Sequence, residues 1–372
     1  MRRVQSKLNT EHKYDLVFFE IVGFCNAKCP WCITGNRSIN ESSYPSKIIQ
    51  VNDFENAINI LLDGNIICPG VGAIYLCNWG EPMLHPELNM ILRILNKKSI
   101  YFGLSTNASK IVHFDNDVLE NLSEVKFSMP GFSQSSYDRI HGLSFDRILR
   151  NIYMVIENIE KEGASVRLTM AYHIYQFNIG EIKSAAKFCK ENGIEFAPYV
   201  AYLNDYNLVR SYLDKSISKE LLGKMSKDLL LYYVDELIAK APENYECPQF
   251  NILTIDEYCN VLTCCLLPKD HPEYSLGNIF ELSSNEIQKG KISQRVCIDC
   301  IKSGIAYWAH NALVPDFLDD YNYILEEEQR LQQKDLKLQE RDNVINAILD
   351  SKSLRLGRAL TWPARYIVDR LK

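Results

Sequence analysis

No apolar run in the 372 residues reaches the length of a transmembrane helix, and the polar, basic stretch Met1–Thr10 lacks the apolar core of a secretory signal. The histidines show no metal spacing to one another, and no phosphate-binding loop or serine-hydrolase elbow is present. Acidic residues outnumber basic ones by 47 to 41, and a net charge of −6 argues against nucleic-acid binding. We therefore expect a cytoplasmic protein without a nucleic-acid partner.

Cysteine is what the sequence has in excess, with 12 residues. Without an export signal, metal binding explains so many cysteines better than disulfides do. Cys25, Cys29 and Cys32 follow the apolar run Asp15–Val22, which has the pattern of a buried strand, at C-x3-C-x2-C spacing. Structural zinc takes four ligands, so three thiols favour an iron–sulfur cluster with one iron left without a protein ligand. A zinc knuckle and three incidental thiols are the alternatives.

Short β-like runs alternate with amphipathic helical patterns from Asp15 to Val200. Strands are expected at Leu16–Ile21, Ala73–Cys77, Tyr101–Ser105, Val125–Met129, Ser165–Tyr172 and Ile194–Val200. Helices are expected at Phe54–Asp63, Pro86–Asn96, Asn116–Leu122, Phe145–Glu162 and Ile179–Asn192, with Asn52 or Asp53 as the cap of the first. This alternation predicts an α/β fold with a parallel sheet. Ligands of such folds bind at the carboxyl ends of the strands, so residues that follow the strands are the site candidates.

The cysteine motif, with Trp31 at its aromatic position, resembles that of the radical S-adenosylmethionine (SAM) superfamily. Six β/α units are likewise similar to the partial (β/α)6 barrel of these enzymes. The resemblance implies a [4Fe-4S] cluster on Cys25, Cys29 and Cys32, whose open iron binds SAM. It also implies that the reduced cluster cleaves SAM and that the resulting 5′-deoxyadenosyl radical abstracts hydrogen from a substrate carbon.

The expected strand ends carry further motifs of this superfamily. Asn78-Trp79-Gly80-Glu81-Pro82 resembles its Gly-Gly-Glu-Pro motif, with Trp79 replacing the first glycine. Ser105-Thr106-Asn107 resembles its ribose-contacting Ser-Thr-Asn-Gly, with Ala108 in place of glycine. The SAM contacts that the resemblance implies are Trp31, Gly80, Glu81, Ser105, Asn107 and Ser128. Arg167 is added because an arginine at an inward strand position needs a partner, and the cofactor carboxylate is one candidate. Taken alone, these residues also fit an ordinary turn, a helix cap and, for Arg167, a structural ion pair.

A second set of cysteines follows a Leu-rich helical stretch, Ser218–Lys240. Asp256–Cys265 has the pattern of a hairpin that ends in thiols, and Cys297-Ile-Asp-Cys300 closes the set. The arrangement resembles the SPASM/twitch domain, with Cys259 at the glycine of its Gly-x4-Cys motif, which makes Cys264 and not Cys265 the ligand. The resemblance implies one auxiliary [4Fe-4S] cluster on Cys247, Cys264, Cys297 and Cys300, and a structural zinc is the alternative. Cys68, Cys77 and Cys189 are expected to be buried apolar fillers.

The expected organisation has five parts: a barrel over 1–217, a helical linker over 218–246, a cysteine-rich auxiliary-cluster domain over 247–310, a charged helix over 311–350 and a basic amphipathic tail over 351–372. The tail carries six basic residues and one acid, interleaved with leucines and Trp362. This pattern fits peripheral contact with the inner face of a membrane, and a frayed basic tail is the alternative. The tail also resembles those of bacterial surface-polysaccharide enzymes.

The function expected from these features is that of a radical SAM oxidoreductase that acts on a small molecule, in particular a sugar or surface-glycan precursor. Such an enzyme needs a reducing partner such as flavodoxin or ferredoxin. Two alternatives stay open, namely a peptide-maturing radical SAM enzyme and a non-catalytic cluster or zinc protein. About fourteen residues precede the first expected strand, which argues against the leader-binding domain that peptide-maturing enzymes usually carry.

Overall fold

The computed structural model describes residues 14–35, 46–201, 203, 205–312, 330 and 333–347. Contacts divide the chain into two units, Met1–Leu313 and Val314–Lys372. The expected basic tail over 351–372 lies outside the described residues, as does much of the expected charged helix. In the second unit, residues 333–347 are helical and every described side chain is exposed, including Leu338 and Ile345. No helix in the described part of the chain is both long and apolar enough to cross a membrane.

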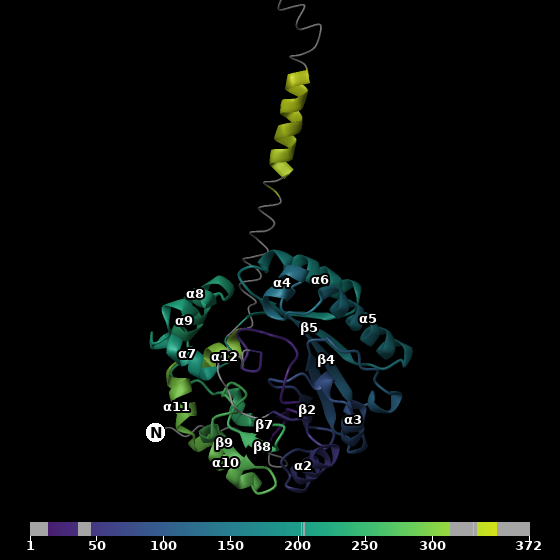
Figure 1. The fold of residues 1–372 in the computed structure, drawn as a ribbon, viewed down its shortest axis with the longest axis vertical. Coiled ribbons are helices and arrows are strands. Elements are labelled where there is room, and N and C mark those ends of the chain that lie inside the picture. The colour runs from purple at the N-terminus through teal and green to yellow at the C-terminus, as the bar shows by residue number, and fades with distance from the viewer. Residues whose placement is uncertain are drawn as a thin grey trace, which may run out of the picture. The chain divides into compact units, whose positions relative to one another are not determined.

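A nine-stranded sheet forms the centre of the first unit, in the order β6-β5-β4-β3-β2-β1-β7-β8-β9 (Figure 1). Its strands are β1 Leu16–Phe19, β2 Ala73–Leu76, β3 Tyr101–Thr106, β4 Leu122–Met129, β5 Arg167–Ile174, β6 Glu195–Val200, β7 Ile252–Ile255, β8 Asn260–Leu262 and β9 Ser275–Asn278. Strands β1 to β6 pair in parallel, one after the next. The expected α/β fold with the strand arrangement of a partial barrel is therefore confirmed, and the sheet is open.

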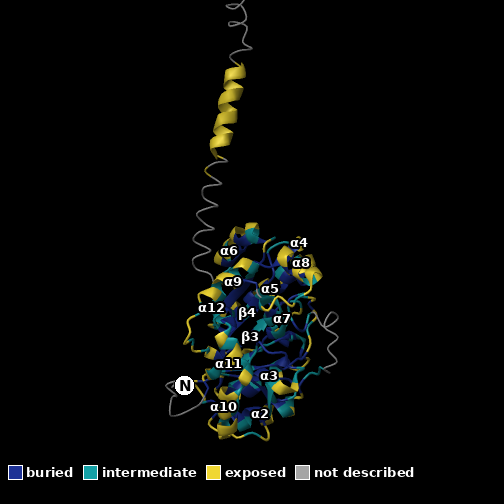
Figure 2. Cartoon of the chain, turned by 90° about the vertical axis from the view of Figure 1, so that its left-hand side faces the viewer, coloured by how far each residue is buried: buried dark blue, intermediate teal, exposed yellow. Residues whose placement is uncertain are grey.

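Helices follow the parallel strands and cover the outside of the curved sheet, so the strands are buried and the outer helix faces are exposed (Figure 2). They are α2 Val51–Asp63, α3 Leu88–Lys97, α4 Gln134–Ile140, α5 Phe145–Lys161 and α6 Ile182–Glu191. The apolar faces of α3 and α5 supply buried side chains such as Leu92 and Ile152. Burial of these faces drives the helices onto the sheet.

Two local predictions are wrong. The expected helix Asn116–Leu122 is only a 3-10 turn, Asn116–Val118, because Leu122 already pairs with Phe102 as the first residue of β4. Pairing with β3 outweighs the helical pattern of so short a segment. The first helix begins earlier than expected, at Val51, and neither Asn52 nor Asp53 caps it, because Gln50 is its N-cap residue.

The cysteine-rich segment joins the same sheet as the barrel strands. Strand β7 pairs in parallel with β1, and β8 and β9 continue antiparallel from it. Its helices are α10 Ser284–Ser293, α11 Arg295–Lys302 and α12 Ile305–Asn311. Strand β1 leads into the first set of cysteines, and β7 belongs to the segment that carries the second set. The pairing of β1 with β7 therefore holds the two cysteine regions next to each other.

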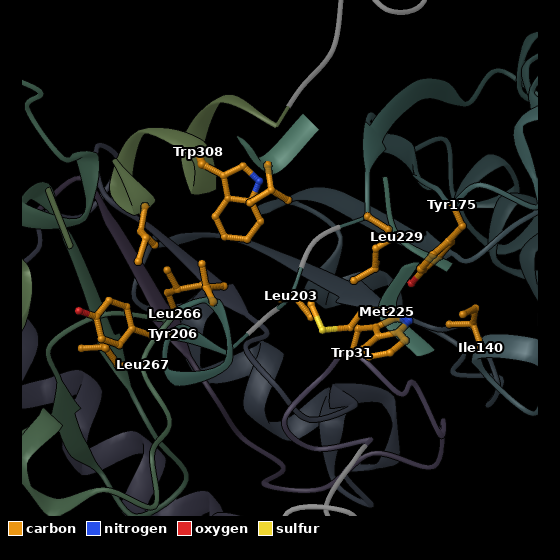
Figure 3. Close-up of a cluster of buried hydrophobic side chains, with 14 residues drawn as sticks. Trp31, Ile140, Tyr175, Leu203, Tyr206, Met225, Leu229, Leu266, Leu267 and Trp308 are labelled. Atoms are coloured by element: carbon orange, nitrogen blue, oxygen red, sulfur yellow. The ribbon is translucent and has the colours of Figure 1, made fainter. Parts of the chain in front are cut away.

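The helical segment between the two cysteine regions is longer than expected. It contains α7 Tyr206–Leu213, α8 Lys219–Asp228 and α9 Leu231–Ala239. Their apolar side chains form one buried cluster with Trp31 of the first cysteine loop and Trp308 of α12 (Figure 3). The cluster therefore ties the first cysteine loop to the region of the second.

Candidate active site

Cys25, Cys29 and Cys32 lie in the loop after β1 and line one cavity of about 280 Å³ at the carboxyl edge of the sheet. The amide of Ala27 donates to Cys25 Sγ at 3.4 Å, and Asn107 Nδ2 lies 3.5 Å from the same sulfur. Burial raises the pKa of the Cys25 thiol to about 12. Such thiols are neutral by themselves and become good ligands when a metal displaces their protons.

Trp31, between the second and third of these cysteines, lines the cavity and anchors the loop. Its indole Nε1 donates to Asp228 Oδ2 at 3.1 Å, and its ring packs in the buried cluster with Met225 and Leu203 (Figure 3). Arg139 binds the other oxygen of Asp228 with its Nε at 2.7 Å. Trp31 therefore positions the cysteine loop by binding the end of α8.

Gly80 and Glu81 follow β2 and border the same cavity, but the Glu81 carboxylate is taken up by the protein. It accepts hydrogen bonds from Thr106 Oγ1 at 2.7 Å, from the amide of Asn107 at 2.7 Å and from the amide of Met83 at 3.0 Å. Glu81 thus braces the end of β2 against the end of β3. A side chain at Gly80 has no space, because a Cβ would lie 1.7 Å from the carbonyl oxygen of Val22.

The end of β3 brings Ser105 and Asn107 to this cavity. Asn107 Nδ2 donates to Asn26 Oδ1 at 3.0 Å, which links the strand end to the first cysteine loop. Ala108, which stands where the similar motif has glycine, adopts φ +54°. This left-handed conformation favours glycine, so the backbone keeps the shape of the motif although the residue departs from it.

The far side of the cavity is formed by residues that the sequence reasoning mostly missed. Ser128 of β4 was predicted, and its Oγ lies 3.3 Å from His173 Nε2 of β5. Tyr199 of β6 shares that nitrogen through its hydroxyl, and His173 and Tyr199 are register partners in the sheet. His141, the residue after α4, completes this side. We call Ser128, His141, His173 and Tyr199 the histidine wall. His173 and Tyr199 could have been found from the sequence, because each is a polar residue at the carboxyl end of an expected strand.

Arg167 is not at the cavity, which corrects the prediction that it contacts SAM. It is the first residue of β5, at the end of the strand opposite to His173. Its side chain is 60% exposed and pairs with Glu124 of β4 at 3.2 Å. The guanidinium charge of Arg167 is compensated by Glu124 on the neighbouring strand and by its exposure to solvent. Arg167 therefore needs no cofactor carboxylate as a partner.

The second set of cysteines lines a separate, small cavity of about 30 Å³. Cys247, Cys264, Cys297 and Cys300 all contribute to it, and Cys265 does not. Cys259 has φ +64°, so the residue at the expected glycine position has the backbone that glycine favours, which supports the alignment through Cys264. A hydrogen bond from Cys265, together with the Leu266 amide, lowers the pKa of Cys264 to about 7 despite its burial. Because Cys264 lines the cavity of the other three thiols and Cys265 does not, the geometry favours Cys264 as the ligand.

The other three cysteines differ in their surroundings. Cys189 is buried, as expected of a filler, whereas Cys68 and Cys77 are only partly buried. Cys77, at the end of β2, lines the larger cavity. No group of three or more His, Cys, Asp or Glu side chains among the described residues lies close enough to hold a single metal ion. Each thiol set instead lines a cavity, which is the arrangement that a multi-atom cluster requires.

A buried lysine accompanies the second set. Lys291 is 1% exposed and donates to the backbone carbonyl of Ile252, and no ion pair with a carboxylate is found for it among the described residues. Burial lowers its pKa, and the thiolates of Cys264, Cys297, Cys265 and Cys247 oppose that change. A fully buried ammonium requires a negative partner. Here the nearby candidates are the thiolates of the second cysteine set.

Residues 19–195 match the model of the Radical SAM superfamily. The chain therefore carries a radical SAM domain. This domain indicates an enzyme and implies a [4Fe-4S] cluster and SAM as its cofactors. The larger cavity fits a [4Fe-4S] cluster together with SAM. Its loop offers three soft thiol ligands, and open space remains between these thiols and the surrounding strand ends.

Relatives of the chain are distant. A protein of Methanocaldococcus jannaschii described as a glycyl-radical enzyme activating enzyme is 23% identical over 208 residues, which cover 54% of this chain and 74% of that protein. A tungsten-containing aldehyde ferredoxin oxidoreductase cofactor-modifying protein of Pyrococcus furiosus is 26% identical over 117 residues, 32% of this chain and 30% of that protein. Among solved structures, SuiB of Streptococcus suis bound to SAM has a TM-score of 0.49 at 15% identity, over 78% of this chain and 71% of that one.

Proposed function

We propose that the protein is a radical SAM oxidoreductase with one auxiliary [4Fe-4S] cluster and a sugar or surface-glycan precursor as its substrate. The observation that carries the proposal is that three thiols and the ends of strands β2 to β6 enclose one cavity. When bound there, a reduced [4Fe-4S] cluster supplies the electron that cleaves SAM to methionine and a 5′-deoxyadenosyl radical, which takes a hydrogen atom from the substrate. The electron for this step comes from a partner such as flavodoxin or ferredoxin.

The residues of the cavity hold the reactants and exclude water. Cys25, Cys29 and Cys32 would bind the cluster, and the amide of Ala27 stabilises negative charge on Cys25. Gly80 leaves backbone accessible at the end of β2, and Ser105, Asn107 and Ser128 offer polar groups at the next two strand ends. The buried side chains of Trp31 and Trp79 shield the site, which keeps a reactive radical from solvent.

Cys247, Cys264, Cys297 and Cys300 would hold the auxiliary cluster. Their common cavity and the buried amino group of Lys291 support this assignment, because an anionic cluster satisfies a lysine for which the described residues supply no carboxylate partner. A two-electron oxidation leaves a second electron to remove, and an auxiliary cluster is a suitable acceptor.

Iron counting tests the cofactors. We expect about eight irons per chain after anaerobic reconstitution, from two four-iron clusters. Replacing Cys25, Cys29 and Cys32 with alanine should leave about four irons and abolish SAM cleavage, whereas Cys68→Ala should change neither. Bound zinc without iron after anaerobic preparation would exclude the radical chemistry.

The auxiliary set is tested separately. Replacing Cys297 and Cys300 with alanine should remove about four irons, while the first cluster still cleaves SAM without productive turnover. Cys264→Ala should reduce the iron content in the same way, and Cys265→Ala should not. The reverse result for Cys264 and Cys265 would move the ligand by one residue.

A further inference from the structure

The histidine wall has hydrogen-bonding capacity that the protein does not use. His141 is 2% exposed, and its Nδ1 has no hydrogen-bond partner among the described residues. Trp79 is 3% exposed, lines the same cavity and has an indole Nε1 without a partner. Asn78, which also lines this cavity, has an Nδ2 without a partner among the described residues. Buried polar atoms in folded proteins are almost always satisfied, so these unsatisfied groups on one cavity indicate a ligand that bonds to them. The indole Nε1 of Trp79 can only donate a hydrogen bond, whereas Nδ1 of His141 donates or accepts depending on the tautomer.

The wall is also electrically neutral. Burial lowers the pKa of His173 to about 4 and that of His141 to about 3, so both rings are uncharged near neutral pH. Among the described residues that line the cavity, Glu81 alone is a Lys, Arg, Asp or Glu. Its carboxylate is saturated by three hydrogen bonds from the protein. Apart from the thiols that would hold the cluster, the described lining therefore offers no free charged side chain to a phosphate, a carboxylate or an ammonium group of a substrate.

The geometry of the wall suits hydroxyl groups. His173 Nε2 is shared between Ser128 Oγ and the Tyr199 hydroxyl, and the rings of His173 and Tyr199 lie with centroids 4.7 Å apart. Three neighbouring strands thus present an imidazole and two hydroxyls side by side, each able to change between donating and accepting. A ligand hydroxyl, which also donates and accepts, can enter such a network without leaving a group unpaired.

We propose that the histidine wall is a subsite for a neutral, hydroxylated substrate such as a sugar ring, with His173 and Tyr199 as the residues that select its hydroxyl group. The proposal rests on the proposed function and narrows its substrate class. It excludes substrates whose reacting part carries a phosphate or carboxylate. Tyr175, whose ring stacks on Phe177, also lines this cavity and adds an aromatic side chain to it.

Binding to the full, reconstituted chain in the presence of SAM tests this subsite. The probes are methyl glycosides of neutral hexoses and N-acetylhexosamines, the matching uronic acids and 6-phosphates, and N-acetylated amino-acid amides. Saturation-transfer NMR detects binding, and calorimetry gives Kd. We expect at least one neutral glycoside to bind at millimolar concentration or below. Its charged counterparts and the amides should bind at least about tenfold more weakly.

Three variants connect the binding to the wall. Tyr199→Phe and His173→Phe should each raise the Kd of the glycoside about tenfold, as the loss of one buried hydrogen bond does. Tyr172→Phe is the matched control. Tyr172 precedes His173 on β5, but its hydroxyl donates to the carbonyl of Asn178, and the residue does not line the cavity. This substitution should leave the Kd unchanged. Thermal unfolding of each variant checks that the fold is intact.

Several results would overturn the subsite. These are the absence of binding by every neutral glycoside, stronger binding by the charged probes or the amides, and equal binding by Tyr199→Phe. If the variants weaken SAM binding by the same factor as glycoside binding, the pair instead serves the ribose of SAM. Formation of 5′-deoxyadenosine by the wild-type chain with a chemical reductant and no sugar tests the proposed function by itself. Its success without glycoside binding would refute only the subsite.

Discussion

Two lysines of the described part of the chain are buried, and they differ in what surrounds their ammonium groups. Lys269 lies 2.9 Å from Glu20 and 2.7 Å from Glu257. The amino group of Lys291 donates to the backbone carbonyl of Ile252 and lies near the thiols of the second cysteine set. Paired charges are retained in protein interiors, whereas an unpaired one is costly. The pairing of Lys269 is complete in the chain itself, and the pairing of Lys291 requires thiolates.

Lys291→Met should therefore change the properties of the proposed auxiliary cluster, because it removes a basic group beside the four thiols without removing a ligand. We expect the midpoint potential of that cluster to fall by about 60 mV or more, a tenfold change in a one-electron equilibrium. A redox titration followed by electron paramagnetic resonance measures it. Lys289→Met is the control, since Lys289 is exposed on the same helix. Equal potentials in the two variants would show that Lys291 does not interact with the cluster.

At the scale of elements, the ends of β1 and β2 and the β7–β8 hairpin meet at one buried charge cluster. Glu20, the residue after β1, accepts from the amide of Gly80 at 2.7 Å and binds Lys269. Glu257, in the turn after β7, binds the same lysine. Desolvation raises the pKa of Glu20 to about 7 from 4.5, Lys269 opposes this, and Glu257 adds to it. Two carboxylates share one ammonium, so the folded protein retains a proton on Glu20.

The stability of the fold should consequently fall as pH rises from about 4.5 to about 7. In this window the unfolded chain has released the Glu20 proton and the native chain still holds it, so higher pH favours unfolding. The Glu20 contribution approaches at most about 1.4 kcal/mol per pH unit. Glu20→Gln should remove this slope in denaturant unfolding measured at several pH values. An unchanged slope in the variant would assign the pH dependence to other groups.

At the scale of the whole molecule, the basic tail gives a prediction about location. Ser351–Lys372 has a charge excess of 6 − 1 = +5 on a chain of net charge −6. Each base near an anionic surface contributes about 1 kcal/mol, and the attraction fades within about 8 Å at physiological salt. We propose that the tail docks the enzyme reversibly on an anionic membrane.

Truncation after Asp350 should abolish sedimentation with anionic vesicles and leave iron content and SAM cleavage intact. Salt should weaken the sedimentation of the full chain, because the attraction is electrostatic. Neutral vesicles are the control. Failure of the full chain to sediment with anionic vesicles at low salt would remove the membrane proposal and leave the radical chemistry untouched.

The sequence by itself determined what depends on local pattern. The β-like and helical patterns located strands β1 to β6, and the spacing of Cys25, Cys29 and Cys32 indicated the first site, because both signals lie in neighbouring residues. Ser128 was predicted from the resemblance to radical SAM enzymes, as the serine near the end of the fourth strand. Arg167 was misplaced because strand alternation alone suggested an inward side chain, whereas the residue stands at the amino end of β5 and the site lies at the carboxyl ends of the strands.

Only the tertiary structure decided which distant residues meet. The parallel pairing of β7 with β1, the three bonds that occupy Glu81, and the convergence of His141, His173 and Tyr199 join segments far apart in the chain. The burial of Lys291 among the second set of thiols is likewise invisible in the sequence, where it is one of 41 basic residues. Hydrogen bonding and charge depend on distance and on exclusion of water, and both arise only when the sheet brings these segments together.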